Sequence, residues 1–324
     1  MVTQPVTPEE TVKVLLPNTL ELHPQLPEGA VAITYDAGAP IPEEHLDAQV
    51  LVDWEVRRRL VNDAAERLHN LKLVQALSAG ADGVLRAPFD PSVAICSGVG
   101  LHDHTVTEHT TALILALLRR LPESLEAQRR HEWSWELGGA QPLRGERHIT
   151  TLLDARVLIW GFGSIGQTLA PILSALGARV TGVARSAGTR SGFRTITDED
   201  LPQELPETDL LVMILPGTAG TANALNAERL AMLSERALVV NVGRGSTVDE
   251  DALLTALRRG AIAGAALDVT AKEPLPEASE LWDAPNLILT PHAAGGSPVG
   301  ADELIAANVH ALMTGEQLRN RQPR

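Results

Sequence analysis

The stretch RVLIWGFGSIGQTLAPILSALGARVTGV, residues 156–183, decides the fold. It contains an apolar strand pattern, a glycine-rich turn, a helical pattern that ends at Gly177, and a second strand pattern. Its turn has the spacing Gly-x-Gly-x-x-Gly, which in this setting is typical of dinucleotide binding, although an ordinary tight turn is the alternative. Gly161 would allow the bend, Gly163 the approach of a pyrophosphate, and Gly166 close packing of the helix on the strand. We therefore predict that the phosphates bind at the helix N-terminus, on Gly161, Gly163, Ser164, Ile165 and Gly166.

Strand patterns recur along the chain and alternate with helical patterns, which predicts an α/β architecture. The strands are continuously apolar, as in parallel sheets covered on both faces. Val106–His131 has a long helical pattern that we expect to cross between two domains, and Gly138–Gly145 has the composition of a loop. The expected strands are Val12–Leu16, Ala30–Tyr35, Gln49–Val52, Leu71–Leu77, Val93–Cys96, Arg156–Trp160, Arg179–Val183, Leu210–Leu215, Leu238–Val242, Ala263–Val269 and Leu287–Thr290. The expected helices are Glu55–His69, Ile165–Leu176, Ala227–Leu233, Asp249–Arg259 and Asp302–Met313.

Length and composition exclude several classes of protein. At about 150 residues per domain, 324 residues suggest two domains. The net charge of −14 argues against a nucleic-acid partner. The single cysteine, Cys96, excludes a disulfide framework and a cysteine-rich zinc site, and we expect no metal at His102, His104 and His109. With no signal-peptide pattern and no apolar run long enough for a bilayer, we expect a cytoplasmic protein with no membrane partner.

The residues after the second strand of the dinucleotide unit bear on the choice of cofactor. An NAD site usually has an acidic residue there, to bind the ribose 2′-hydroxyl. The chain has Ala184, Arg185 and Ser186 instead, within 43 residues, Ala155 to Thr197, that contain five arginines and no acid. Arg185 and Ser186 suit a 2′-phosphate, so NADP(H) is favoured and NAD(H) stays possible. The alternative is that these arginines are solvated loop residues.

Three charged residues follow later strand patterns, and the carboxyl ends of parallel strands meet at one edge of a sheet. They are Arg244, Glu273 and His292. Taken singly, each has an ordinary explanation, as a loop cation, a helix-start acid and a buried structural histidine.

Together with the glycine turn, these segments resemble the D-2-hydroxyacid dehydrogenase family, which includes glyoxylate/hydroxypyruvate reductases, D-lactate dehydrogenases and phosphoglycerate dehydrogenases. The similar segments are Ser78–Asp82, Val106–His109, Leu215-Pro216, Val242–Gly245, Ala266–Val269, Glu273–Pro276, Leu281-Trp282, Pro285-Asn286 and Thr290–His292. The resemblance implies a Rossmann-type doubly wound sheet in a dinucleotide-binding domain, residues 104–294. It also implies a smaller flavodoxin-like substrate domain, residues 1–103 joined by the C-terminal helix 295–324. A homodimer formed through the crossover region is implied as well.

The resemblance also implies catalytic roles. Arg244 would bind the substrate carboxylate and polarise the keto oxygen, because a guanidinium forks onto two oxygens. His292 would be the general acid in reduction and the base in oxidation, and Glu273 would hold its ring and favour the imidazolium. The backbone amides of Ala79 and Gly80 would complete the carboxylate site.

Further positions match family residues at the cofactor and the substrate. Asp268 would contact the nicotinamide carboxamide, or would be a structural acid at a strand end. Trp133 would reach the active site of a partner subunit, or would pack at the dimer interface. Leu215, Pro216 and Val242 would line the cofactor site.

The expected function is hydride transfer between NADP(H) and a small 2-keto or 2-hydroxy acid, as in glyoxylate/hydroxypyruvate reductases. NAD-dependent oxidation of a D-2-hydroxy acid, phosphoglycerate included, is the nearest alternative. A dinucleotide-sensing binding protein without catalysis is the alternative from another class.

Overall fold

The computed structural model describes residues 11–323, and the chain divides into two compact units. One unit is Met1–His102 together with Ser297–Arg324, and the other is Asp103–Gly296. Each unit has its own parallel sheet.

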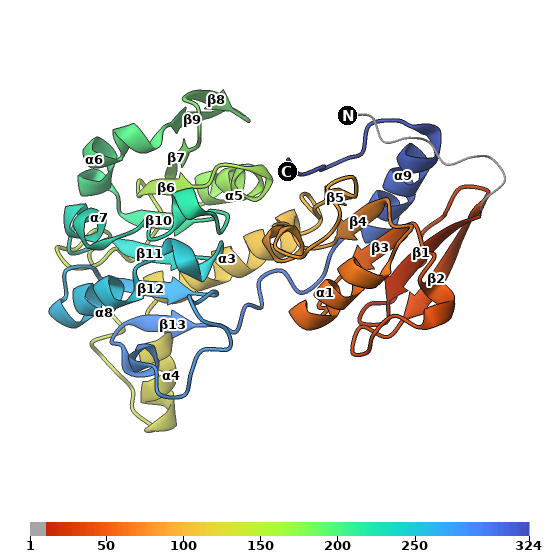
Figure 1. Cartoon of the computed structure of the whole chain (residues 1–324). Helices are drawn as coiled ribbons and strands as arrows, with labels where there is room; N and C mark the ends of the chain where they lie inside the picture. The colour runs from red at the N-terminus through yellow and green to blue at the C-terminus, as the bar shows by residue number, and fades with distance from the viewer. Residues whose placement is uncertain (1–10, 324) are drawn as a thin grey trace. The chain divides into compact units, whose positions relative to one another are not determined.

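The smaller unit contains a five-stranded parallel sheet in the order β2-β1-β3-β4-β5 (Figure 1). This is the flavodoxin-like order, as predicted. The helices α1 and α2 share a core with one face of the sheet, whereas α9 from the C-terminal segment packs against the other face. The bounds are β1 Val12–Pro17, β2 Ala30–Tyr35, β3 Val50–Asp53, β4 Leu73–Ala76, β5 Ala94–Cys96, α1 Arg58–Arg67, α2 Asp82–Leu85 and α9 Ala301–Thr314.

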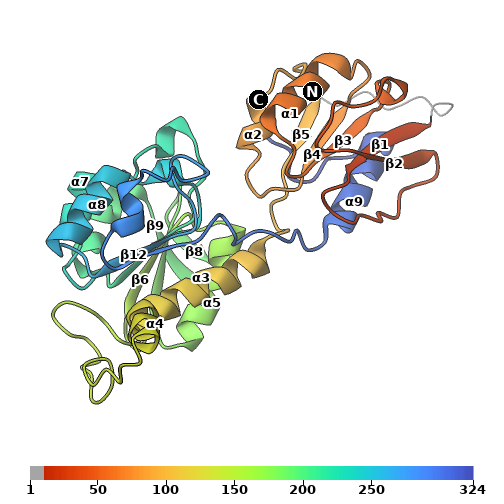
Figure 2. The same cartoon turned by 90° about the horizontal axis from the view of Figure 1, so that it is seen from below.

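The larger unit contains an eight-stranded sheet in the order β13-β12-β11-β10-β6-β7-β9-β8. All neighbouring strands are parallel except β8 and β9. The helices α3 and α5 cover one face, side by side (Figure 2), and α6, α7 and α8 share a core with the other face. The strands are β6 Arg156–Trp160, β7 Arg179–Val183, β8 Gly188–Arg190, β9 Phe193–Ile196, β10 Leu210–Met213, β11 Leu238–Asn241, β12 Gly264–Leu267 and β13 Leu287–Leu289. The helices are α3 Asp103–Leu118, α4 Leu121–Arg129, α5 Ser164–Ala175, α6 Leu201–Glu204, α7 Ala227–Met232 and α8 Glu250–Arg259.

This strand order confirms the prediction of a doubly wound Rossmann-type sheet. The strands after β6 are added first on one side of it and then, from β10 onward, on the other, and sheets of this type bind ligands beyond the carboxyl ends of the strands at such a switch point. The glycine turn follows β6, at this same edge. The fold therefore brings the turn and the ends of β10 to β13 to one edge of the larger unit.

The helical pattern at Val106–His131 corresponds to two helices, not one. The first, α3, ends at Leu118, and α4 begins at Leu121 after Arg120, which has a φ of +51°. A left-handed residue cannot continue a right-handed helix, and Pro122 fits the first turn of the new one. The crossover therefore changes direction before the loop that follows α4.

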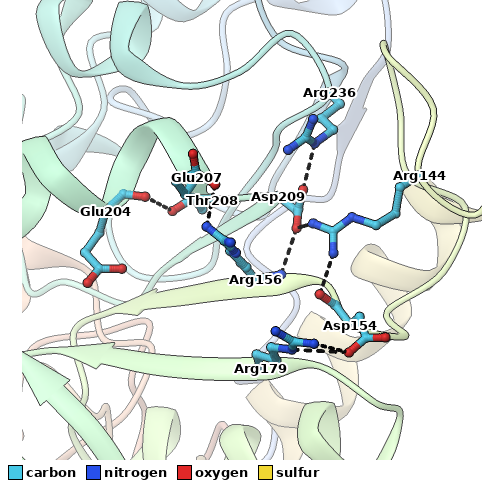
Figure 3. Close-up of polar contacts among 9 residues, drawn as sticks. All are labelled: Arg144, Asp154, Arg156, Arg179, Glu204, Glu207, Thr208, Asp209 and Arg236. Atoms are coloured by element: carbon cyan, nitrogen blue, oxygen red, sulfur yellow. Dashed lines mark hydrogen bonds and ion pairs between the residues drawn. The ribbon is translucent and has the colours of Figure 1, made fainter.

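The amino edge of the larger sheet is held by a buried acid, Asp209, which precedes β10 (Figure 3). Its carboxylate accepts hydrogen bonds from Arg144, from Arg236 at 2.9 Å and from the amide of Arg156 at 2.8 Å. Burial opposes the ionised form, but these donors outweigh it and hold the pKa of Asp209 below its ordinary value. Because Arg144 lies in the Gly138–Gly145 loop, this cluster fixes that loop to the base of the sheet.

Candidate active site

The glycine turn has the geometry that a bound pyrophosphate requires. Gly161 has a φ of +105°, and a Cβ there would lie 2.4 Å from the carbonyl oxygen of Ile214. A Cβ on Gly166 would lie 3.0 Å from the carbonyl oxygen of Gly161, so the helix start packs closely on the turn. A Cβ on Gly163, in contrast, would meet nothing within 4 Å. The open space lies at the N-terminus of α5, where the first amides have no intrahelical partner, so these residues fit a dinucleotide.

Arg185 and Ser186 lie just beyond β7, at the same edge of the sheet, and both are exposed. Ser186 accepts a hydrogen bond at 2.7 Å from Arg190, a residue that we did not predict as part of the site. No carboxylate within residues 11–323 forms an ion pair with Arg185. Its charge therefore stays available to an anion.

Glu273 and His292 form the central polar pair. The Nδ1 of His292 lies 2.8 Å from Oε2 of Glu273, and the amide of Thr270 donates to Oε1 of Glu273 at 3.0 Å. The hydrogen bond to Glu273 raises the pKa of His292, against the opposing effect of burial. Burial opposes ionisation of Glu273, but the hydrogen bonds from His292 and Thr270 outweigh it and lower the pKa of that carboxyl. With Nδ1 engaged, the imidazolium presents Nε2 as its remaining proton donor.

The backbone of His292 adopts a conformation that a non-glycine residue rarely adopts, with a φ of +53°. Its amide lies 2.8 Å from the carbonyl oxygen of Asp268 and 3.0 Å from that of Thr290. These contacts hold the chain in a strained turn directly after β13 and Thr290. Such strain persists where the surrounding structure determines the position, often at functional sites.

Arg244 follows β11, and its loop is held by Asn241, whose side chain is fully buried. Asn241 donates to the carbonyl oxygen of Arg244 at 3.1 Å and accepts from the amide of Gly243 at 3.1 Å. A Cβ on Gly245 would lie only 1.9 Å from the carbonyl carbon of Thr270, so the Arg244 loop packs directly against the loop that leads to Glu273. The positive charge of Arg244 acts on both members of the polar pair, favouring a lower pKa in each.

Asp268 has a full set of partners within the protein. Its carboxylate accepts hydrogen bonds from the hydroxyl of Thr290 at 2.6 Å and from the amides of Ala293 and Ala294 at 2.8 and 3.1 Å. The Nε2 of His109, in α3, lies 3.3 Å from the same carboxylate and 3.0 Å from the hydroxyl of Thr290. These contacts fix the chain around the histidine of the central pair, which favours the structural role for Asp268. The predicted contact with a nicotinamide carboxamide stays a prediction.

Three apolar residues of the predicted cofactor site lie at strand ends on this edge. Val242 follows β11 and is buried, whereas Leu215 and Pro216 follow β10, where Leu215 is half-buried and Pro216 is exposed. A Cβ on Gly243 would lie 2.7 Å from the backbone of Leu215, so the two strand ends pack together. They form the apolar part of the edge beside the glycine turn.

The structure does not bring Trp133 to this edge within the chain. Trp133 and Trp135 follow α4, contact each other edge to face, and are 80% and 81% exposed. The surface beside α4 includes Leu238, Gly264 and Leu287, the first residues of β11, β12 and β13, so it lies at the amino edge of the sheet. A role for Trp133 at an active site would therefore require the partner subunit.

Ala79 and Gly80 lie in the smaller unit, in the loop after β4. Within the described residues, neither amide donates to another backbone carbonyl, while the hydroxyl of Ser78 donates to the carbonyl oxygen of Gly80 at 2.9 Å. Both amides are thus available to an acceptor. Their role in binding a carboxylate stays a prediction.

Several residues of the site were not predicted from the sequence. His109 and Thr290 are 181 positions apart, and only the fold brings them to Asp268. The position of Asn241 could have been used to predict its role in holding the loop. A polar residue at the end of an apolar strand is costly to bury unless it is hydrogen-bonded. The carboxylate of Glu250 accepts a hydrogen bond from the amide of Ala271 at 2.6 Å, and burial raises the pKa of that carboxyl.

Metal-binding clusters and membrane-spanning helices are both absent from the described part of the chain. Within residues 11–323, no three His, Cys, Asp or Glu side chains are grouped so that they could hold a metal ion. Over the same residues, no helix has the length and apolar character needed to cross a membrane.

Comparison with known proteins gives the family. Residues 111–294 match the model of the NAD-binding domain of D-isomer specific 2-hydroxyacid dehydrogenases. A glycerate dehydrogenase from Methylorubrum extorquens is 32% identical over 266 residues, which cover 78% of this chain and 80% of that protein.

Two solved structures are similar over nearly their whole length. A D-isomer specific 2-hydroxyacid dehydrogenase from Xanthobacter autotrophicus Py2, in complex with NADPH and MES, has a TM-score of 0.80 and 29% identity, covering 97% of this chain and 98% of that one. The NADPH-dependent glyoxylate/hydroxypyruvate reductase from Sinorhizobium meliloti, in complex with NADP and sulfate, has a TM-score of 0.79 and 27% identity, with the same coverage. The resemblance noted in the sequence is thereby confirmed, and the chain belongs to the family of D-isomer-specific 2-hydroxyacid dehydrogenases.

Proposed function

We propose that this protein reduces a small 2-keto acid, such as glyoxylate or hydroxypyruvate, to the 2-hydroxy acid with NADPH. The observation that carries the proposal is the 2.8 Å hydrogen bond between Glu273 and His292, beside Arg244 and on the same sheet edge as the glycine turn. An acid, an anion-binding group and a dinucleotide turn are the parts that this reduction needs. The similar proteins named above include a glycerate dehydrogenase and a glyoxylate/hydroxypyruvate reductase.

The chain's own residues supply the steps other than hydride delivery. Bound NADPH supplies the hydride for the carbonyl carbon. Nε2 of His292 donates a proton to the carbonyl oxygen, and the resulting alcohol carries the added hydrogen and the added proton. Glu273 keeps the ring oriented and protonated, because an imidazolium is stabilised by a neighbouring carboxylate. Arg244 binds the substrate carboxylate and draws electron density from the keto oxygen.

The preference for NADP(H) is part of the proposal. Arg185 and Ser186 stand where an NAD site would carry an acid, and Arg185 has no ion-pair partner within the described residues. Both solved structures named above hold NADPH or NADP.

The division of labour between the units is proposed too. The larger unit, Asp103–Gly296, would bind the cofactor, and the smaller unit would bind substrate. A homodimer is supported by exposed apolar side chains on α4 and in the loop after it, where a monomer would leave them in water. These are Leu121, Leu125, Trp133, Trp135 and Leu143. The predicted cytoplasmic location stays a prediction.

Turnover tests this proposal. Purified protein is mixed with NADPH or NADH and with glyoxylate, hydroxypyruvate, pyruvate or phenylpyruvate, and cofactor oxidation is followed by absorbance. We expect oxidation of NADPH with glyoxylate or hydroxypyruvate. Tight cofactor binding without oxidation by any keto acid would instead support the dinucleotide-sensing protein, and a strong preference for NADH would support the NAD-dependent alternative.

A further inference from the structure

The β8–β9 hairpin is an addition to the parallel sheet that the sequence patterns did not predict. It joins Gly188–Arg190 to Phe193–Ile196 through a two-residue turn, in which Ser191 and Gly192 both have positive φ, +49° and +84°. This is the turn whose twist suits a two-residue hairpin. It pairs Arg190 directly with Phe193, so the position of Arg190 is set by the strand register.

The hairpin is attached to the glycine turn and to the helix after it. The rings of Phe193 and Phe162 contact edge to face, with centroids 6.3 Å apart. The hydroxyl of Ser191 donates to the side-chain oxygen of Gln167, on α5, at 2.7 Å. Arg190 reaches the carbonyl oxygen of Phe162 at 3.5 Å, the long limit for a hydrogen bond. The hairpin therefore keeps a fixed place beside the predicted pyrophosphate site.

The five arginines of the acid-free stretch divide into two groups. Arg156 pairs with Glu207, Arg179 pairs with Asp154 at 2.6 Å, and Arg194 pairs with Glu204 at 2.6 Å (Figure 3 shows the first two pairs). Arg185 and Arg190 form no ion pair with any carboxylate of residues 11–323. Unlike the other three arginines, these two therefore retain their charge for a ligand.

Ser186 links these two arginines. Arg190 donates to its hydroxyl oxygen at 2.7 Å and to its carbonyl oxygen at 3.3 Å. The first bond uses a lone pair of the hydroxyl and leaves its hydrogen as a donor. Arg185 directly precedes Ser186 in the chain, so one loop and one hairpin supply two arginines and an O–H donor, a set that suits the three oxygens of a phosphate monoester dianion.

We propose that Arg190, held by the β8–β9 hairpin, binds the 2′-phosphate of NADPH together with Arg185 and Ser186 and decides the choice between NADPH and NADH. This inference rests on the proposed preference for NADP(H) and adds a specificity-determining residue on a different element. The hairpin's contacts with Phe162 and Gln167 would set the spacing between the 2′-phosphate site and the pyrophosphate site. Arg185 alone, on an exposed loop, would bind the phosphate less selectively.

Equilibrium binding without substrate tests the proposal. Dissociation constants are measured by calorimetry for NADPH, NADH, adenosine 2′,5′-bisphosphate and 5′-AMP, on the wild-type protein and on Arg190→Ala and Arg190→Lys. We expect Arg190→Ala to weaken NADPH and the bisphosphate about 10- to 100-fold, the range for hydrogen bonds to charged groups, and to leave NADH and 5′-AMP within about twofold. Arg190→Lys should restore part of the loss, since it keeps the charge and not the fork.

Arg194→Ala is the matched control, because Arg194 lies on the same hairpin but is paired with Glu204. It should leave the ratio of the NADPH and NADH constants unchanged. Equal weakening of NADPH and NADH by Arg190→Ala, or no change in either, would overturn the role of Arg190 while the wild-type preference stands. A wild-type protein that binds NADH as tightly as NADPH would overturn the proposed preference and this inference with it.

Discussion

The amino and carboxyl ends of the strands in the larger sheet carry charged side chains that act in opposite ways. At the amino edge, Asp209 is fully buried, and its carboxylate accepts hydrogen bonds from two arginines and a backbone amide (Figure 3). At the carboxyl edge, His292 and Glu273 pair with each other while their side chains stay 46% and 38% exposed. Charges compensated inside the protein hold the fold, whereas charges left accessible can act on a ligand.

The largest effect is expected from His292→Ala, which removes the proposed proton donor of the accessible edge. Loss of a general acid lowers turnover about 10²- to 10⁴-fold. Because the side chain is half exposed, the urea midpoint should change little. Steady-state kinetics measure the loss of turnover, and calorimetry checks that the variant still binds NADPH. A variant that keeps more than a tenth of wild-type turnover would contradict the assignment.

Asp209→Ala should do the reverse at the amino edge. It leaves Arg144 and Arg236 without their carboxylate and frees the loop around Arg144, so we expect a loss of about 3–5 kcal/mol of stability. Urea denaturation measures this loss. The kcat of the folded fraction at low temperature should stay within about twofold, and a selective loss of kcat with normal stability would erase the contrast between the edges.

The pH dependence of reduction should show the raised pKa of His292. In the proposed mechanism the protonated form is the acid, so kcat/KM for keto-acid reduction should stay high below that pKa and fall as pH rises through it, above the ordinary value of about 6.5. Oxidation of the hydroxy acid needs the neutral ring, and its rate should rise over the same range.

Glu273→Gln tests whether the falling limb of this pH profile belongs to His292. Removing the carboxylate removes the main cause of the raised pKa, so the falling limb should move to lower pH. An unchanged profile in this variant would show that the limb belongs to another group.

The smallest effect is expected from Arg179→Ala, at the exposed pair with Asp154 on the amino side of β7. Exposed ion pairs contribute about 0–1 kcal/mol because water screens them. Thermal melting, turnover and NADPH affinity should all match the wild type. A changed cofactor preference would mean that arginines already paired with a carboxylate also select the cofactor, which would contradict the different roles of paired and unpaired charges.

The strand and helix patterns predicted most of the fold because they are local. The glycine turn with its flanking strand and helix specified the Rossmann-type unit, whereas Arg244, Glu273 and His292 were noted for their positions after apolar strands and assigned to the site by the resemblance to the family. Parallel sheets bring such strand ends together wherever they lie in the chain.

The features that sequence patterns missed depend on short or distant contacts. The β8–β9 hairpin has strands of three and four residues, too short and too exposed to produce an apolar pattern. The break at Arg120 depends on one backbone angle inside a continuous helical pattern. The contacts of His109 and Thr290 with Asp268 join segments that are far apart in the sequence of the larger unit, and only the folded structure reveals them.

The most direct test of the central claim follows the hydride itself. The protein is given hydroxypyruvate and NADPH that carries deuterium at the transferable position, and the product is analysed by mass spectrometry and chiral chromatography. We expect D-glycerate with deuterium on carbon 2, formed by the wild type and not measurably by His292→Ala over the same time. A product without deuterium would contradict direct hydride transfer at the accessible edge of the sheet, and an L product would contradict the D-specific geometry of that transfer.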